Sequence, residues 1–332
     1  MDRLKIVEIL PQSVNLNQID DSPGPYCMSY GFDTAPLAES IRRIGLINPP
    51  ILVKKGEGGG EIEFSVVAGF RRIRALKTLG ETHIPCRVLP PETPPRECLL
   101  INLYENLTLR DFNPVEKGMA LARLLEWIPG KEAIKTFMPL FDLPSHEETL
   151  HLFMQIETAF ERPAKDLLAS GELSTKAAKL LLEMDSVDRE EFCRYFSVIK
   201  FSKNQQTQFI EFIHDLSHIE NNAIARLLDD PELTDICDNE QMNSPQKARA
   251  LITLLRSRRL PRLVKAEKGF RRMVEKLALP AGYQITPPPF FEGPHYKLEI
   301  SFENGNDLMG KLLILVKKEG LVTLEDPWDK SV

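Results

Sequence analysis

The stretch FSVVAGFRRIRA, residues 64–75, is an apolar run that passes through one glycine into a basic segment. The residues before Gly69 have the composition of a buried strand, and a helical pattern follows it, with Arg71, Arg72 and Arg74 in its first turn and a half. A helix N-terminus presents unpaired N–H groups and a partial positive charge, and glycine lets an anion approach the backbone. Because guanidinium groups pair with phosphate oxygens, this unit predicts a phosphate site. Solvation of the arginines, or pairing with nearby acids, is the alternative that spacing alone leaves open.

Strands and helices alternate on both sides of this unit. Strands are expected at residues 51–54, 62–67 and 86–89, and helices at residues 37–44, at residues 70–79 and from the proline-rich 90–95 through residue 103. This alternation predicts an α/β domain over residues 36–112, preceded by an irregular segment at residues 1–35.

The rest of the chain has a different character. Helical periodicity recurs from Asn113 to about residue 228, and Asn113, Pro114 and Glu116 have the residue types of a capped helix start. The polar stretch 229–246 is predicted to be a linker. Residues 247–332 are predicted to form a small α+β domain with a basic first helix, a strand at 296–302, a helix at 307–318 and a strand at 321–324. The sequence therefore predicts an α+β multidomain protein.

The composition is that of a soluble globular protein, with 332 residues, 42% hydrophobic residues and a net charge of -6. This mild acidity excludes a basic coat over the whole chain but not one local basic face. No apolar run approaches the roughly 20 residues that a bilayer requires, and the N-terminus lacks the apolar region of a signal peptide. The five cysteines are scattered and form no C-x-x-C pair, so we expect a cytoplasmic protein.

Glu105 and Asn106 are candidate metal ligands. A carboxylate beside a carboxamide offers oxygen atoms suited to Mg²⁺. A surface turn is the alternative that these two residues alone do not exclude.

Three boxes in the same order and at compatible spacing resemble the ParB partition-protein family. GLINP at residues 45–49 resembles its G-x-x-Q-P box, with Asn48 in place of Gln. VAGFRRIRA at residues 67–75 resembles its G-E-R-R-x-R-A box, and ENLTLRDFNPVE at residues 105–116 resembles its E-N-x-x-R-x-x-L-N-P-x-E box. The resemblance covers roughly residues 35–125 and extends more weakly to about residue 200.

The resemblance implies a ParB/sulfiredoxin-like N-terminal domain that binds CTP with Mg²⁺, followed by a helical domain with a DNA-binding helix-turn-helix. In such proteins nucleotide binding closes a dimer into a clamp around DNA, and hydrolysis helps to release it. By position, the implied nucleotide-binding residues are Gly69, Arg71, Arg72, Arg74, Glu105, Asn106 and Arg110, of which Glu105 and Asn106 would also serve the metal.

Two positions depart from the family pattern. Phe70 replaces the usual Glu and removes a polar group from the expected pocket. The family's third-box Arg falls on Leu109, and Arg110 is displaced by one residue, which turns a helical side chain by about 100°. Nucleotide binding could survive these changes while CTP hydrolysis is lost. Phe70 also stands where sulfiredoxin has its catalytic Cys, so sulfiredoxin chemistry is excluded.

The helical domain has an unusual charge for a DNA reader. Residues 172–178 resemble the family's G-x-L-S-x-x-H-A turn, which places the helix-turn-helix around residues 131–157 and its recognition helix at residues 145–156. Between residues 136 and 161 there is no Lys or Arg, and the acids are Asp142, Glu147, Glu148, Glu157 and Glu161. DNA phosphates would be repelled by such a face. Two alternatives therefore stay open: this helix reads DNA, or the fold is retained and reused for a protein partner.

The basic residues are concentrated elsewhere, in a run opposed only by Glu267 and Glu275. The cations are Arg256, Arg258, Arg259, Arg262, Lys265, Lys268, Arg271, Arg272 and Lys276. If they lie along one helix, they form a sequence-independent phosphate contact. An ordinary solvated helix with acidic cover from its own chain is the alternative.

The predicted function is that of a ParB-like, nucleoid-associated DNA clamp that responds to CTP and acts in chromosome or plasmid partition. The expected partners are DNA, a second copy of the chain through the C-terminal domain, and a ParA-type ATPase. The alternatives are a nucleotide-responsive transcription regulator on the same scaffold, and a protein-interaction adaptor that has lost nucleotide and DNA binding.

Overall fold

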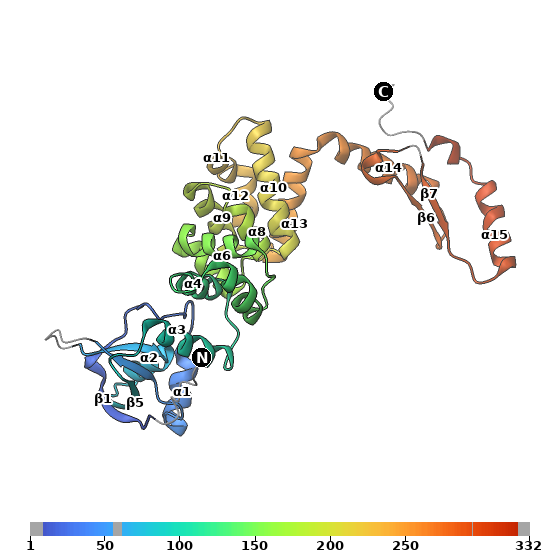
Figure 1. Ribbon diagram of the computed structural model, residues 1–332. Helices are drawn as coiled ribbons and strands as arrows, with labels where there is room; N and C mark the ends of the chain where they lie inside the picture. Colours follow the sequence, from blue (N-terminus) through green and yellow to red (C-terminus); the bar gives the residue numbers. More distant parts are fainter. Residues whose placement is uncertain (1–8, 56–61, 294, 325–332) are drawn as a thin grey trace. The chain divides into compact units, whose positions relative to one another are not determined.

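A computed structural model describes residues 9–55, 62–293 and 295–324 of the chain (Figure 1). The chain divides into two compact units, Met1–Ile210 and Glu211–Val332. The first unit contains a five-stranded sheet and the second a two-stranded sheet, so the predicted mixture of α and β structure is confirmed. Within the described ranges, no helix is both long enough and apolar enough to cross a bilayer.

The N-terminal sheet has the strand order β1-β5-β3-β4-β2. Its strands are β1 Gln12–Asn15, β2 Ile19–Asp20, β3 Ile51–Lys54, β4 Phe64–Ala68 and β5 His83–Leu89. β5 runs parallel to β3 and β2 parallel to β4, whereas β1 and β5, and β3 and β4, are antiparallel. The three strands expected from the sequence are confirmed.

The expectation that residues 1–35 are irregular is wrong for β1 and β2. These two strands lie at the edges of the sheet and are four and two residues long. A strand that short cannot display the alternating pattern by which a longer strand is recognised. Tertiary pairing and the burial of Val14 and Ile19 hold them in place.

Three helices accompany this sheet: α1 Ala35–Ile44, α2 Phe70–Thr78 and α3 Pro95–Leu107. α2 packs against α1, and α3 packs against β4. Phe70 and Ile73 of α2 lie in the same hydrophobic core as Leu52, Val66 and Cys86. Because α2 is anchored by this apolar face, its arginines remain on the opposite side. Phe70 therefore packs into the core rather than lining a pocket.

The first unit continues with helices. They are α4 Pro114–Leu125, α5 Gly130–Glu132, a π-helical turn η3 Ala133–Phe137, a 3₁₀ turn η4 Met138–Phe141, α6 Glu147–Ala159, α7 Arg162–Ser170, α8 Thr175–Leu181, α9 Ser186–Val198 and α10 Lys203–Ile219, which extends into the second unit. α4 packs on α6 at close range. A Cβ placed on Gly118 of α4 would lie 2.7 Å from the carbonyl oxygen of Phe153, so this approach of two backbones requires a glycine.

The second unit contains α11 Ile224–Leu228, α12 Pro231–Asp238, α13 Ser244–Arg259, α14 Pro261–Leu277, β6 Tyr283–Thr286, a 3₁₀ turn η5 Pro289–Phe291, β7 Lys297–Ile300, α15 Gly305–Val316 and a 3₁₀ turn η6 Leu321–Thr323. β6 and β7 pair antiparallel, and α14 packs its buried Leu263 and Phe270 against Phe291.

Two expectations for this unit are corrected. The predicted linker at residues 229–246 contains α12 and the start of α13, because Asp230 and Asn243 cap helices that its polar composition hides. The strand expected at residues 321–324 is the 3₁₀ turn η6, since the chain has already turned at Gly320, whose φ is 97°.

The cysteines are mostly enclosed. Cys27, Cys86, Cys98 and Cys193 are buried, and Cys237 is partly buried. Burial raises the pKa of Cys86 to about 12 and the pKa values of Cys98 and Cys193 to about 11. These buried thiols therefore remain protonated at neutral pH.

Candidate functional site

Gly69 joins β4 to α2 in the left-handed conformation, with φ 100° and ψ 25°. A Cβ on this residue would lie 3.0 Å from Nη2 of Arg72, so that guanidinium lies directly over the glycine. Side-chain-bearing residues rarely adopt such a φ, and one placed here would also displace Arg72. The glycine thus permits both the turn into α2 and a cation against the first turn of the helix.

Arg72 is held by three acceptors. Its Nη1 donates to the carbonyl oxygens of Asn48 at 2.7 Å and Pro49 at 3.3 Å, and its Nη2 donates to Oε1 of Glu105 at 2.5 Å. The Arg72 and Glu105 side chains are only 14% and 22% exposed. The sequence predicted both residues as site residues, and their ion pair joins α2 to α3.

Arg71 and Arg74 lie over the ring of Phe32, with their guanidinium carbons 4.7 and 5.4 Å from its centroid. Arg71 also donates from Nη2 to Oε1 of Glu116 at 2.7 Å. Its Nε is buried and has no hydrogen-bond partner among the described residues. A buried donor without a partner is costly, and an incoming anion could satisfy it. Phe32 was missed because one aromatic residue in a loop has no signature in a single sequence.

Glu116 is the centre of the arrangement, and it is only 1% exposed. Its Oε1 accepts from the Tyr30 N–H at 3.0 Å and from Arg71, and its Oε2 accepts from the Asn113 N–H at 3.1 Å and from Nη1 of Arg110. The Glu116 N–H donates to Oδ1 of Asn113 at 3.0 Å, which confirms the predicted cap of α4. The sequence predicted only this capping role. Its burial beside two arginines is a tertiary feature that no local pattern reveals.

Arg110 points inward. It donates from Nε to Oδ1 of Asn106 at 3.1 Å and from Nη2 to the carbonyl oxygen of Met28 at 2.9 Å, and it lies 4.5 Å from the ring centroid of Phe112. Burial lowers the pKa of Arg110, although Glu116 favours its charged form. Leu109, one residue earlier, is 63% exposed.

The candidate metal ligands are committed to other partners. Glu105 binds Arg72, the amide nitrogen of Asn106 donates to Asn102, and its oxygen accepts from Arg110. Across the described ranges, no group of three or more His, Cys, Asp or Glu side chains could hold a metal ion. Mg²⁺ often keeps several waters and uses one or two carboxylates together with substrate phosphates. The residues therefore fit Mg²⁺ only as an ion held mainly by a phosphate ligand, with Glu105 as the carboxylate.

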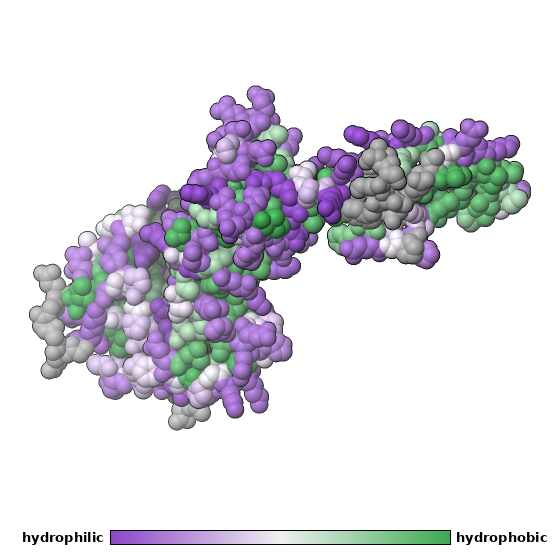
Figure 2. Space-filling model, turned by 90° about the horizontal axis from the view of Figure 1, so that it is seen from above, coloured by the Kyte–Doolittle hydropathy of each residue, from purple (hydrophilic) through white to green (hydrophobic). Residues whose placement is uncertain are grey.

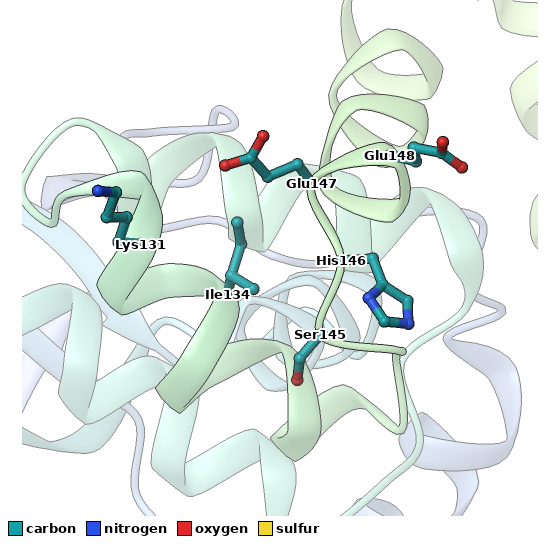
Figure 3. A pocket seen from close by; sticks show the side chains of 6 residues that line it. All are labelled: Lys131, Ile134, Ser145, His146, Glu147 and Glu148. Carbon is teal, nitrogen blue, oxygen red and sulfur yellow. The ribbon is translucent and has the colours of Figure 1, made fainter.

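The helix expected to read DNA is α6, and a shallow hollow lies beside its start (Figure 3). It is lined by Lys131, Ile134, Ser145, His146, Glu147 and Glu148. Glu147 and Glu148 are exposed and form no ion pair with any residue that the structure describes. An adjoining hollow adds apolar side chains of Leu125, Leu150 and Met154. This face thus combines two glutamates and one lysine with apolar side chains.

The basic run of the second unit lies on two helices rather than one, because Pro261 starts α14 after α13 has ended at Arg259. Three of its arginines are covered by acids: Arg256 binds Glu267 at 2.6 Å, Arg258 binds Asp230 at 2.7 Å and Glu220 at 3.0 Å, and Arg259 binds Asp215 at 2.5 Å. The remaining cations of the run are exposed on α14: Arg262, Lys265, Lys268, Arg271, Arg272 and Lys276. The expected acidic cover is present on the run's three arginines of α13, whereas the cations of α14 are exposed, and a phosphate contact there stays a prediction.

α15 presents an uncovered apolar surface. None of its residues is buried, and Leu313 and Ile314 are 57% and 45% exposed. Hydrophobic surface gathers over α15 in the space-filling view (Figure 2). An exposed apolar patch of this kind is typical of an interaction surface.

Comparison with known proteins shows what the chain is similar to. A family model described as ParB N-terminal domain matches residues 7–107. The probable plasmid-partitioning protein ParB of Thermus thermophilus is 30% identical over 159 residues, which cover 48% of this chain and 47% of that protein. The nucleoid occlusion protein of Geobacillus thermodenitrificans is 32% identical over 168 residues, which cover 47% of this chain and 56% of that protein. The chain thus spans about half the length of these curated relatives, and the predicted resemblance is confirmed over that part.

Among solved structures, a C-terminally truncated chromosome-partitioning protein ParB from Caulobacter crescentus, complexed with CTP-γ-S, is 20% identical. The match covers 56% of this chain and 98% of that one, with a TM-score of 0.26.

Proposed function

We propose that this chain, whose residues 7–107 match the family model described as ParB N-terminal domain, is a ParB-like, DNA-associated protein that binds CTP with Mg²⁺ and acts in chromosome or plasmid partition. The observation that carries the proposal is the group formed by Gly69, Arg71, Arg72 and Arg74 at the start of α2, which we call the cationic cradle. It combines a left-handed glycine, three arginines and a buried guanidinium N–H that has no partner in the described part of the chain.

Each part of the cradle has a chemical role towards a triphosphate. The first N–H groups of α2 have no partner within the helix and can donate to phosphate oxygens beside Gly69. Arg71 and Arg72 neutralise phosphate charge, and Glu105 orients Arg72. Glu105 would hold Mg²⁺ together with the phosphates, and the ion would supply positive charge that offsets theirs. Arg74 is exposed and provides long-range attraction.

DNA contact is assigned to α14 rather than α6. The six exposed cations of α14 can neutralise phosphates on any sequence, whereas the acidic edge of α6 repels them. Dimerisation through the apolar face of α15 would place two such basic faces in one assembly, as a DNA clamp requires.

A second candidate function follows from the hollow beside α6. Its apolar side chains, and its two glutamates that pair with no cation among the described residues, favour a protein segment with basic residues over nucleic acid. The helix-turn-helix fold would then serve as an adaptor surface within the same protein.

The proposal is tested by titration calorimetry of the chain with CTP, GTP, ATP and UTP in Mg²⁺. We expect binding that is selective for CTP and is lost in Arg71→Ala. Arg42→Ala is the matched control, because Arg42 is an exposed arginine of α1 that pairs with Glu39 on its own helix at 2.6 Å. Absence of binding to all four nucleotides, with and without duplex DNA, would reject the nucleotide function and leave the adaptor as the better candidate.

A further inference from the structure

Glu116 holds two arginines, and they are anchored unequally. Arg110 is 16% exposed and is fixed by Asn106, by the carbonyl oxygen of Met28 and by the ring of Phe112. Arg71 is 31% exposed, rests on the ring of Phe32 and leaves its buried Nε without a partner among the described residues. Arg71 is therefore the partner that can leave Glu116 at lower cost.

The charges around Glu116 do not balance. Two guanidinium groups surround one carboxylate, which leaves one positive charge in a largely buried site. If Arg71 turned away, Glu116 would still accept from Arg110 and from the N–H groups of Tyr30 and Asn113. The carboxylate would thus avoid the large penalty of a buried charge without partners.

We propose that Glu116 and Arg110 form a fixed pair, and that Arg71 exchanges Glu116 for a nucleotide phosphate. This inference rests on the proposed nucleotide function and adds to it a positioning residue, Glu116, which sets the affinity by competing with phosphate for Arg71. The arginine of the third box stands at position 110 here rather than at 109. This displacement makes the exchange feasible, because Arg110 remains paired with the Glu116 carboxylate when Arg71 leaves it.

Exchange also has a structural result. Arg71 belongs to α2 of the α/β domain, and Glu116 is in the first turn of α4, where the all-helical part begins. A phosphate that takes Arg71 removes a direct ion pair between these two helices. Nucleotide binding would then loosen one contact between the sheet domain and the helices that follow it.

The exchange predicts opposite effects on CTP binding for substitutions of Glu116 and of Arg110. Glu116→Gln removes the competing charge and should tighten CTP binding by about three- to tenfold. Arg110→Leu leaves Arg71 as the only guanidinium on Glu116 and should weaken CTP binding by a similar factor. Glu39→Gln is the matched control, because it removes a carboxylate that pairs with Arg42 and Arg43 on the surface of α1. Weaker binding in both Glu116→Gln and Arg110→Leu would overturn the proposal in favour of a purely structural role.

A second measurement uses the unaltered chain, so that a variant that fails to fold does not decide the matter. The arginine Nε–H signals are followed by ¹⁵N NMR during titration with CTP and Mg²⁺, or with inorganic triphosphate, and are assigned through Arg71→Lys and Arg110→Lys. We expect the Arg71 signal to shift and the Arg110 signal to stay. If triphosphate shifts Arg71 but CTP does not bind, the CTP function fails and the exchange stands. If neither probe shifts Arg71, or if Arg110 shifts with it, the exchange is refuted.

Discussion

Gly69 affects stability and nucleotide binding separately. Stability depends on its left-handed φ, and binding depends on the Arg72 guanidinium that lies over it. Gly69→Ala should lower the free energy of unfolding by about 1–2 kcal/mol through the strained φ, and should also weaken nucleotide binding about tenfold by displacing Arg72. Calorimetry measures both quantities, as thermal unfolding and as ligand titration.

Gly80→Ala is the matched control for this glycine. Gly80 has a φ of 77° just beyond α2, but a Cβ there would meet nothing within 4 Å. We expect a similar loss of stability without a change in nucleotide affinity. An equal loss of nucleotide affinity in Gly69→Ala and Gly80→Ala would mean that both substitutions act by perturbing α2, and not by displacing Arg72.

The individual site residues were predictable to different degrees. Gly69, Arg71 and Arg72 were recognisable because a strand, a glycine and a basic helix are contiguous, and the structure pairs one of them, Arg72, with Glu105. Glu116 was recognised only as a cap. Its contact with Arg71 joins residues far apart in the chain, and a local pattern contains no information on such a pair.

Among the helices, two glycines in helix interiors should respond oppositely to the same substitution. Gly118→Ala forces a Cβ against the Phe153 carbonyl oxygen between α4 and α6, and should destabilise the first unit by about 1–3 kcal/mol. Gly269→Ala in α14 meets open space and should stabilise its helix by about 0.5–1 kcal/mol. Amide hydrogen exchange of each unit reads the two effects separately. Loss of amide protection in both Gly118→Ala and Gly269→Ala would show that the close approach of α4 and α6 does not cause the destabilisation.

The basic face of α14 predicts how DNA affinity depends on salt. Six exposed cations limit the slope of log K against log salt to about -5, whereas all nine cations of the run would give about -8. Replacing Lys265, Lys268 and Arg272 by Ala should reduce the slope by about 3 in fluorescence anisotropy with duplex DNA. Arg226→Ala, which removes an exposed cation of α11, is the control. An unchanged slope in the triple variant would place the DNA contact elsewhere.

The helices and strands show where sequence patterns succeed. β3 and β4 were predicted because each is an apolar run that is buried almost throughout, and α2 because a helical pattern follows the glycine after β4. β1 and β2 are too short for a period, and they form because β4 and β5 offer free edges for pairing. The basic run was ambiguous because charge alone does not reveal that Asp215, Glu220 and Asp230, which lie outside the run, pair with its arginines.

For the chain as a whole, the apolar face of α15 predicts a dimer. Leu312→Glu combined with Leu313→Glu should convert a dimer into a monomer in sedimentation experiments, because each charge would be buried at the interface. Val187→Glu, on the comparably exposed start of α9, should leave the dimer intact. A dimer that survives the α15 changes would show that the chains associate through another surface.

The enclosure of the cysteines has a practical consequence for spectroscopy. Maleimides attack thiolates, and the buried, protonated Cys27, Cys86, Cys98 and Cys193 offer neither access nor charge. Cys237 on α12 is the more accessible thiol. The unmodified sequence therefore supplies one preferred attachment point for a fluorophore or spin label in the second unit, and a second cysteine introduced in the first unit would make the distance between them measurable.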